Sequence, residues 1–249
     1  MGLMAGVLAA AALMAPAPFA PEYVALGDSY ASGAGAGSYV DGSCRRSSNA
    51  YPALRGEDFP SFRFVACSGA TTKSLRWQFR ALTPATTFVT ITVGGNDLGF
   101  VDVMTTCTLK GDRACENRVG KARDFTRDQL PARLDATYAT IRTAAPNAEL
   151  VVLGYPRLFT PDDDCRTLSR AKRQALNDAA DELSGVIAEA ASRAGARYVD
   201  VREAFADHGV CSSEPWINAL VNPTGDSYHP NRAGQAAYFE ALTAGFRKF

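Results

Sequence analysis

The sequence has few of the features that mark nucleic-acid-binding or membrane-surface proteins. Its 26 Lys and Arg balance its 26 Asp and Glu, and it has no basic run that would bind nucleic acid or an anionic membrane surface. It also has no internal repeat, low-complexity tract or linker. At 249 residues the chain is long enough to build one domain with a full core. We therefore expect a single domain, a monomer by default, with no nucleic-acid partner.

Metal and cofactor chemistry has no support in the sequence pattern either. The chain has only two histidines, no His, Asp and Glu cluster has metal-ligand spacing, and no two cysteines form a CxxC pair. We expect no metal and no cofactor. The cysteines number six, an even count that suits disulfides in an exported protein. They can pair in fifteen ways; sequential pairing is favoured because Cys107 and Cys115 bracket a short loop.

The N-terminal apolar run is too short to span a bilayer. It covers Leu3 to Met14, fewer than the roughly 18 residues needed, and prolines and the small-x-small pattern Ala15-Pro16-Ala17 follow it. A buried helix or a membrane anchor is the alternative, and the absence of Lys or Arg before the run departs from a typical leader. We predict a signal peptide over residues 1–20, a secreted domain over residues 21–249 and no stable membrane insertion.

Short apolar runs alternate with helical patterns over the rest of the chain. Runs rich in β-branched and aromatic residues predict parallel strands at 23–27, 62–66, 88–94, 149–155 and 197–201. Apolar residues at helical spacing predict one helix that ends before Pro146 and another that ends before Gly195. They also predict a helix over the C-terminal segment from Asn231 to Phe249. This alternation predicts an α/β fold, a three-layer α/β/α sandwich around a central parallel sheet.

Three residues of interest follow successive predicted strands: Ser29, Gly69 and Asn96. Each has an ordinary explanation, namely a helix cap, a turn with positive φ and a turn after Gly-Gly. In parallel sheets, however, ligands bind beyond the carboxyl ends of the strands. Together the three residues predict one crevice, in which Ser29 is a nucleophile and the other two donate hydrogen bonds to an oxyanion.

The segment GDSYHPNRAGQ, residues 225–235, contains a candidate base. His229 is one of the two histidines, and Asp226 lies three residues before it, so a carboxylate can reach back to the imidazole across a tight turn. A serine nucleophile needs a base to take its proton, and the base needs a partner to fix its tautomer. A surface histidine near a helix-capping aspartate is the alternative.

These blocks, in this order, resemble the SGNH (GDSL) hydrolase superfamily. The blocks are GDSY with Ser29, SGAT with Gly69, GGND with Asn96, and DSYHP with Asp226 and His229. Further stretches, including CRRSSNAYP, TVGGNDLGF and LGYPR, make the chain similar to secreted actinobacterial lipases, esterases and phospholipases A1. The resemblance implies that the backbone N–H groups of Ser29 and Gly69 and the side-chain amide of Asn96 form the oxyanion hole.

The resemblance also implies a fold and a set of disulfides. The fold is the flavodoxin-like sandwich of this superfamily. The cysteines of similar secreted proteins pair in sequence order, which here implies Cys44–Cys67, Cys107–Cys115 and Cys165–Cys211.

Two ways of orienting the histidine are known among such proteins. Some close relatives use a main-chain carbonyl, which here would be that of Ser227. Because Asp226 occupies the usual acid position of the superfamily, we expect a triad of Ser29, His229 and Asp226, in which Ser29 attacks an ester carbonyl and His229 accepts its proton.

Several other polar residues are expected to have structural roles. Asp28 and Asp97 flank catalytic positions and are expected to hold turns, and His208 has no companion motif. The groove that binds the acyl group is expected to be shaped by the loops at 30–45, 98–115 and 157–167.

The sequence therefore predicts a secreted serine hydrolase that cleaves lipid-like carboxylic esters through an acyl-enzyme. A phospholipase A1 and a polysaccharide acetyl esterase are alternatives with the same catalytic residues. A non-catalytic lipid or glycan binder is the competing class, and it is disfavoured because Ser29, Asn96 and His229 are all intact.

Overall fold

A parallel sheet forms the centre of the structure, which is a computed structural model that describes residues 20–161 and 165–244. The five strands lie in the order β4 (Ser61–Phe64), β1 (Glu22–Gly27), β5 (Phe88–Thr92), β6 (Glu149–Leu153) and β7 (Arg197–Val199). All five predicted strands are present, with ends that differ by one or two residues. The predicted signal peptide lies outside the described residues, apart from Ala20.

The strand order creates a switch point between β1 and β5. From β1 the chain moves to β4 on one side, and from β5 it continues to β6 and β7 on the other side. Because the connections leave these two neighbours in opposite directions, a crevice opens beyond their carboxyl ends, where ligands bind in such sheets. Ser29 directly follows β1 and Asn96 follows β5, so the topology places both residues at this crevice.

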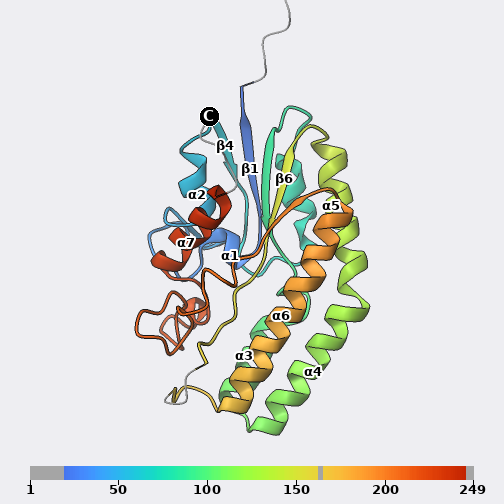
Figure 1. Cartoon of the computed structure of the whole chain (residues 1–249). Coiled ribbons are helices and arrows are strands. Elements are labelled where there is room, and N and C mark those ends of the chain that lie inside the picture. Colours follow the sequence, from blue (N-terminus) through green and yellow to red (C-terminus); the bar gives the residue numbers. More distant parts are fainter. Residues whose placement is uncertain (1–19, 162–164, 245–249) are drawn as a thin grey trace, which may run out of the picture.

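Helices cover both faces of the sheet (Figure 1). On one face α2 (Tyr51–Gly56) packs against α7 (Arg232–Thr243), and on the other α5 (Leu130–Ala144) packs against α6 (Arg170–Arg193). The predicted three-layer sandwich is thus confirmed. The C-terminal helix begins where it was expected and ends at Thr243, and residues 245–249 of the predicted helix lie outside the described part of the chain.

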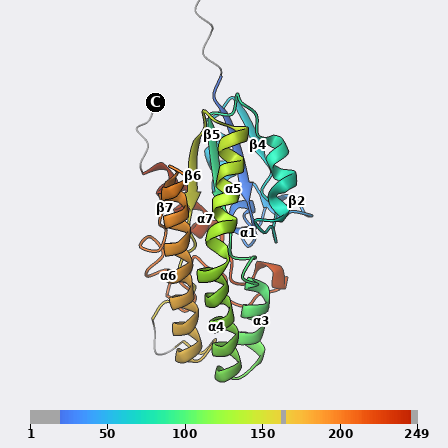
Figure 2. The ribbon, with the colours of Figure 1, turned by 90° about the vertical axis from the view of Figure 1, so that its right-hand side faces the viewer.

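A further group of helices lies beyond the carboxyl ends of the strands (Figures 1 and 2). It consists of α3 (Phe100–Leu109), α4 (Asp112–Asp128) and the first half of α6, with α4 packed against both neighbours. The prediction of a loop over 98–115 was wrong, because α3 and the start of α4 occupy most of this range. The periodic signal of α4 is weak because just four of its residues are buried, in a narrow stripe of Cys115, Val119, Ala122 and Thr126.

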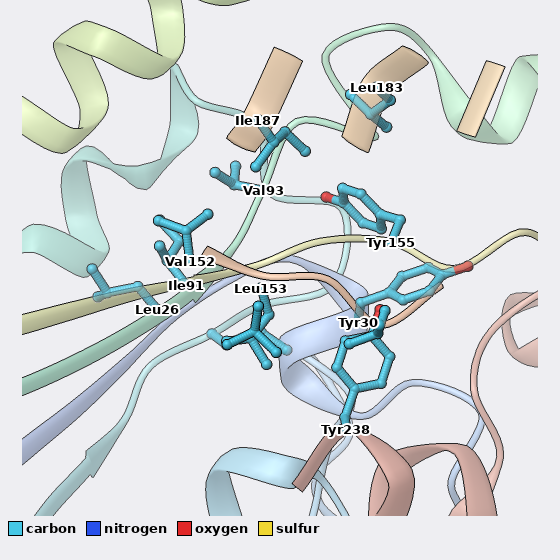
Figure 3. Packing of buried hydrophobic residues seen from close by; sticks show 14 of the residues in the cluster. Leu26, Tyr30, Ile91, Val93, Val152, Leu153, Tyr155, Leu183, Ile187 and Tyr238 are labelled. Carbon is cyan, nitrogen blue, oxygen red and sulfur yellow. The ribbon is translucent and has the colours of Figure 1, made fainter. Parts of the chain in front are cut away.

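The core lies between the sheet and its two helical layers. All five residues of β5 are buried, as expected of a parallel strand that helices cover on both faces. Figure 3 shows Leu26 of β1, Ile91 of β5 and Val152 of β6 close together, with Ile187 of α6 further along the same layer, and each of these side chains is fully buried. Burial of one such aliphatic side chain contributes roughly 1.5–3 kcal/mol.

Three disulfides tie the loops around the carboxyl edge. They join Cys44 to Cys67, Cys107 to Cys115, and Cys165 to Cys211, which confirms the sequential pairing. The first fastens the hairpin of β2 (Tyr39–Asp41) and β3 (Arg46–Ser47) to the segment after β4, and the second joins α3 to α4. Among residues 20–161 and 165–244, no helix is long and apolar enough to cross a membrane.

Candidate active site

Ser29 is the first residue of the short helix α1 (Ser29–Ser32), which begins directly after β1. Gly27 makes this sharp turn possible, because its φ is 128° and a Cβ added there would lie 2.5 Å from the carbonyl oxygen of Thr92. Asp28 caps the helix by accepting a hydrogen bond from the backbone N–H of Tyr30. Ser29 is therefore fixed at the carboxyl edge of the sheet by the backbone around it.

The structure brings His229 to Ser29 from 200 residues further along the chain. The imidazole Nε2 lies 2.8 Å from Ser29 Oγ, and Nδ1 lies 2.9 Å from the main-chain carbonyl oxygen of Ser227. Because a carbonyl oxygen can only accept, Nδ1 carries the proton and Nε2 is left as the base that faces the hydroxyl. Burial lowers the pKa of His229 to about 4, with a smaller contribution from the Arg45 guanidinium. The imidazole is thus neutral at pH 7.

Asp226 is not the partner of His229, which corrects the prediction from sequence. Asp226 ends the 3-10 turn η2 (Thr224–Asp226), and its carboxylate binds the Arg45 guanidinium, the Tyr39 hydroxyl and the backbone N–H of Gly35. The spacing of three residues permits a carboxylate–imidazole contact but does not require one. Here the Nδ1 proton already has an acceptor, and the guanidinium offers the carboxylate a charged donor.

The backbone around His229 is held from two sides. Tyr228 lies between Ser227 and His229 in the chain and adopts the left-handed conformation, with φ of 59°. This turn lets the Ser227 carbonyl bind the His229 imidazole. That conformation costs a residue with a Cβ roughly 1–2 kcal/mol. It is supported by the Tyr30 hydroxyl, which donates to the Tyr228 carbonyl at 2.8 Å, and by backbone hydrogen bonds of 2.9 Å that Asn218 makes with Tyr228 and His229.

The three groups predicted to bind an oxyanion have hydrogens to donate. The backbone N–H groups of Ser29 and Gly69 find no acceptor within the part of the chain that the structure describes. The Asn96 amide donates one hydrogen to the Ala70 carbonyl at 3.0 Å, and its second hydrogen has no acceptor among the described residues. Gly69 has φ of 82°, so a residue with a Cβ would be strained there.

Asp97 joins the loops that carry Gly69 and Asn96. Its carboxylate accepts hydrogen bonds from the Thr72 backbone N–H at 2.9 Å and from the Thr72 hydroxyl at 2.6 Å. The expectation of a structural role for Asp97 agrees with these contacts. Asp97 thus ties together the loops of Gly69 and Asn96, two residues predicted to bind the oxyanion.

A contact of Asp28 was not anticipated from the sequence. The Tyr155 hydroxyl, just after β6, donates to the Asp28 carboxylate at 2.5 Å and accepts from the Gly95 N–H at 3.1 Å. Burial raises the pKa of Asp28 to about 7, against the opposing effect of the hydrogen bonds from Tyr155 and Tyr30. Tyr155 therefore links the turns after β1, β5 and β6, and the position of LGYPR at a strand end is the signal that could have revealed it.

His208, the second histidine, lies in a structural contact. Its ring stacks on Trp216 with centroids 3.6 Å apart, and its Nδ1 lies 2.9 Å from the Glu214 carbonyl oxygen. This agrees with the structural role expected for it. Among the described residues no group of three or more His, Cys, Asp or Glu is arranged to hold a metal ion.

An apolar cavity adjoins the Ser29 hydroxyl. It contains about 670 Å³ of space that no atom fills, including the part open to solvent, and Ser29, Tyr30 and Asn96 lie on its wall. Figure 3 shows Tyr30 and Tyr155 together with Leu183 of α6, all three of which line this cavity. Most of the remaining wall comes from α3, α4 and α6: Phe100, Val103, Val119, Ala122, Arg123, Thr126, Leu176, Ala179, Ala180 and Leu183.

The cavity differs from the groove expected from the sequence. The predicted loops contribute just a few residues to it, among them Tyr30, Phe100 and Leu158, and helices α4 and α6 supply much of its wall. An apolar space beside the Ser29 hydroxyl is suited to hold the hydrocarbon part of a substrate.

Comparison with known proteins identifies the family. The model of the GDSL-like lipase/acylhydrolase family matches residues 25–237, a range that contains Ser29, Asn96 and His229. The chain belongs to this family. A lipase from Streptomyces rimosus is 47% identical over 234 residues, which cover 92% of this chain and 87% of the relative. Lipase 1 from Streptomyces coelicolor is 45% identical over 240 residues, 93% of this chain and 89% of the relative.

Solved structures of the family agree with this assignment. An extracellular lipase from Streptomyces rimosus superposes with a TM-score of 0.88 at 45% identity, covering 91% of this chain and 100% of that one. A phospholipase A1 from Streptomyces albidoflavus NA297 superposes with a TM-score of 0.88 at 46% identity and the same coverage. An acetylxylan esterase from Geobacillus stearothermophilus, at 17% identity and a TM-score of 0.56, shares the fold alone. As a family member the chain is a carboxylic ester hydrolase.

Proposed function

We propose that this protein is a secreted lipase that hydrolyses acyl esters of lipid-like substrates through a Ser29–His229 dyad and an acyl-enzyme. The observation that carries the proposal is the 2.8 Å contact between Ser29 Oγ and His229 Nε2 at the wall of an apolar cavity. The similar lipases of Streptomyces support the substrate class. Secretion is supported by the relative described as extracellular and by the predicted signal peptide.

In the first step the Ser29 oxygen forms a bond to the ester carbonyl carbon while its proton moves to His229 Nε2. The carbonyl oxygen becomes an oxyanion, which the Ser29 and Gly69 N–H groups and the free hydrogen of the Asn96 amide stabilise. Removing one such donor typically costs roughly 2.7–4 kcal/mol of transition-state stabilisation. The protonated imidazole keeps its second hydrogen bond to the Ser227 carbonyl.

In the second step the bond between the carbonyl carbon and the alcohol oxygen breaks, and the leaving alcohol takes the proton from Nε2. The acyl group remains on Ser29 with its chain in the apolar cavity. A water molecule then gives a proton to Nε2 and adds to the acyl carbon, and the same oxyanion donors act again. Collapse of this intermediate releases the fatty acid and returns the proton to Ser29.

Labelling with a fluorophosphonate probe tests the nucleophile and its base. We expect mass spectrometry of the disulfide-intact protein to find the adduct on Ser29. The adduct should be absent in Ser29→Ala and form at least a thousandfold more slowly in His229→Ala. His208→Ala is the matched control, since it removes the other histidine of the chain and should label at the normal rate. A folded protein that fails to react would contradict the catalytic proposal and favour a lipid binder.

Phospholipase A1 activity is the second candidate, and the similarity to the Streptomyces albidoflavus enzyme favours it. The two candidates share every catalytic step and differ in the substrate that presents the ester. Phosphatidylcholine vesicles with distinguishable acyl chains at the first and second glycerol positions should be compared with a triacylglycerol emulsion. Faster release of the first-position chain from the phospholipid would favour the phospholipase, and faster hydrolysis of the emulsion would favour the lipase.

A further inference from the structure

Two side chains of α4 border both the catalytic cavity and a groove on the outer surface. The groove lies between α4 and α6. Besides the two shared residues, it is lined by Glu116, Gly120, Ala171, Gln174, Ala175 and Asp178. Val119 and Arg123, both on α4, line the groove and also the cavity that holds Ser29. They therefore form a wall between the inner apolar space and the outer surface, and we call this pair the α4 wall.

An ion pair fixes the Arg123 side of the wall. Arg123 Nε donates to the Glu182 carboxylate of α6 at 2.5 Å, and Arg127 binds the other oxygen of the same carboxylate at 2.8 Å. The Glu182 side chain is 19% exposed, whereas that of Arg123 is 41% exposed. The Arg123 stem can thus cover the cavity while its guanidinium is held by Glu182 of α6.

Arg123 is a cation in a wall that is otherwise largely hydrocarbon. The other α4 residues on the cavity are Val119 and Ala122, which are apolar, and Thr126, whose hydroxyl donates to the Ala122 carbonyl at 2.9 Å. Helix α6 contributes Leu176 and Ala179 to the same cavity. Each methylene of an acyl chain that is buried in an apolar space makes the binding free energy more favourable. That contribution is lost where the chain meets a guanidinium group held by a carboxylate. Growth of the chain past this point would require the ion pair to open.

We propose that Arg123, held by Glu182, is a specificity-determining residue that limits the length of the acyl chain the enzyme accepts. The α4 wall closes the cavity, and chains that reach it stop there. Removing the Arg123 side chain would join the cavity to the outer groove and let longer chains pass between α4 and α6. This inference rests on the proposed function, because it takes the cavity beside Ser29 to be the acyl site.

The test is a chain-length series of p-nitrophenyl esters from C4 to C16, read as the ratio of kcat/KM for C16 to that for C4. We expect Arg123→Ala to raise this ratio at least about tenfold, since each additional buried methylene is worth roughly a factor of four. Arg123→Lys keeps a long stem and a cation, and it should retain the native ratio. Arg127→Ala is the matched control: it removes a bond to the same Glu182 but does not line the cavity, so its ratio should stay within about twofold.

A second variant covers the case in which Arg123→Ala does not fold. Val119→Ala thins the α4 wall at its other residue and should raise the ratio in the same direction by a smaller factor. Each variant is first labelled with the fluorophosphonate. If the native protein does not label at Ser29, the proposed function itself fails. If the proteins label but neither wall variant raises the ratio, or Arg127→Ala raises it equally, the role of Arg123 is overturned.

Discussion

Replacing Asp226 by Asn separates a Ser–His dyad from a Ser–His–Asp triad. If the carboxylate oriented His229, its loss would lower kcat by roughly 10⁴-fold, as in triad enzymes. In this structure the Nδ1 proton is bound by the Ser227 carbonyl at 2.9 Å, and that backbone group survives the substitution. We therefore expect kcat/KM for a short ester to fall by less than about tenfold.

The remaining effect of Asp226→Asn should come through Arg45. The side chains of this ion pair are 24% and 17% exposed, so its loss should cost about 1 kcal/mol and lower Tm by about 2–4 °C. Arg45 would be left without its counter-charge, and its guanidinium already depresses the pKa of His229. The acid limb of the kcat/KM profile should consequently move to lower pH.

Arg45→Gln is the matched partner of this experiment. It breaks the same ion pair and should lower Tm by a similar amount, but it removes the positive charge and should move the acid limb to higher pH. The assay is steady-state kinetics between pH 3 and 8 with thermal unfolding in parallel. A loss of a thousandfold or more in Asp226→Asn, with Arg45→Gln nearly unaffected, would refute the dyad.

Further predictions follow from the same geometry. Because His229 must be neutral to accept the Ser29 proton and its pKa is lowered to about 4, kcat/KM should stay level down to about pH 5 and fall below pH 4; an acid limb near 6.5 would contradict the buried geometry. Asn96→Ala should lower kcat by about 10²–10³-fold with little change in Tm, and a loss below tenfold would remove Asn96 from the oxyanion hole. Tyr155→Phe should lower the free energy of unfolding in urea by about 1–3 kcal/mol, because one oxygen of the buried Asp28 carboxyl loses its donor while the other keeps the Tyr30 N–H; an unchanged unfolding midpoint would show that the contact is not stabilising.

Much of the fold could be predicted from local pattern. Strands such as 88–92 are continuous apolar runs because helices cover both faces of a parallel sheet, and such runs stand out in sequence. Helix α4 was missed for the opposite reason. It packs mainly against α3 and α6 rather than into the sheet, so it shows mostly charged residues with a narrow buried stripe.

The candidate site also has features that could be predicted from the sequence and features that could not. Strand topology alone brings Ser29 and Asn96 together, because the carboxyl ends of neighbouring parallel strands meet at one edge. The role of Asp226 was misjudged because sequence spacing shows which groups can come into contact but does not show which of them a carboxylate binds. Its partner, Arg45, lies 181 residues away in the chain, and nothing local to Asp226 points to it.

The sequence by itself therefore determined the alternation of strands and helices, the placement of Ser29, Gly69, Asn96 and His229, and the family they indicate. These features depend on local periodicity and on short motifs. The tertiary structure decided that a backbone carbonyl orients His229, that Tyr155 holds Asp28, and that α3, α4 and α6 enclose the cavity. Each of these depends on contacts between segments that are far apart in the sequence, and the packing of the chain decides which of these contacts form.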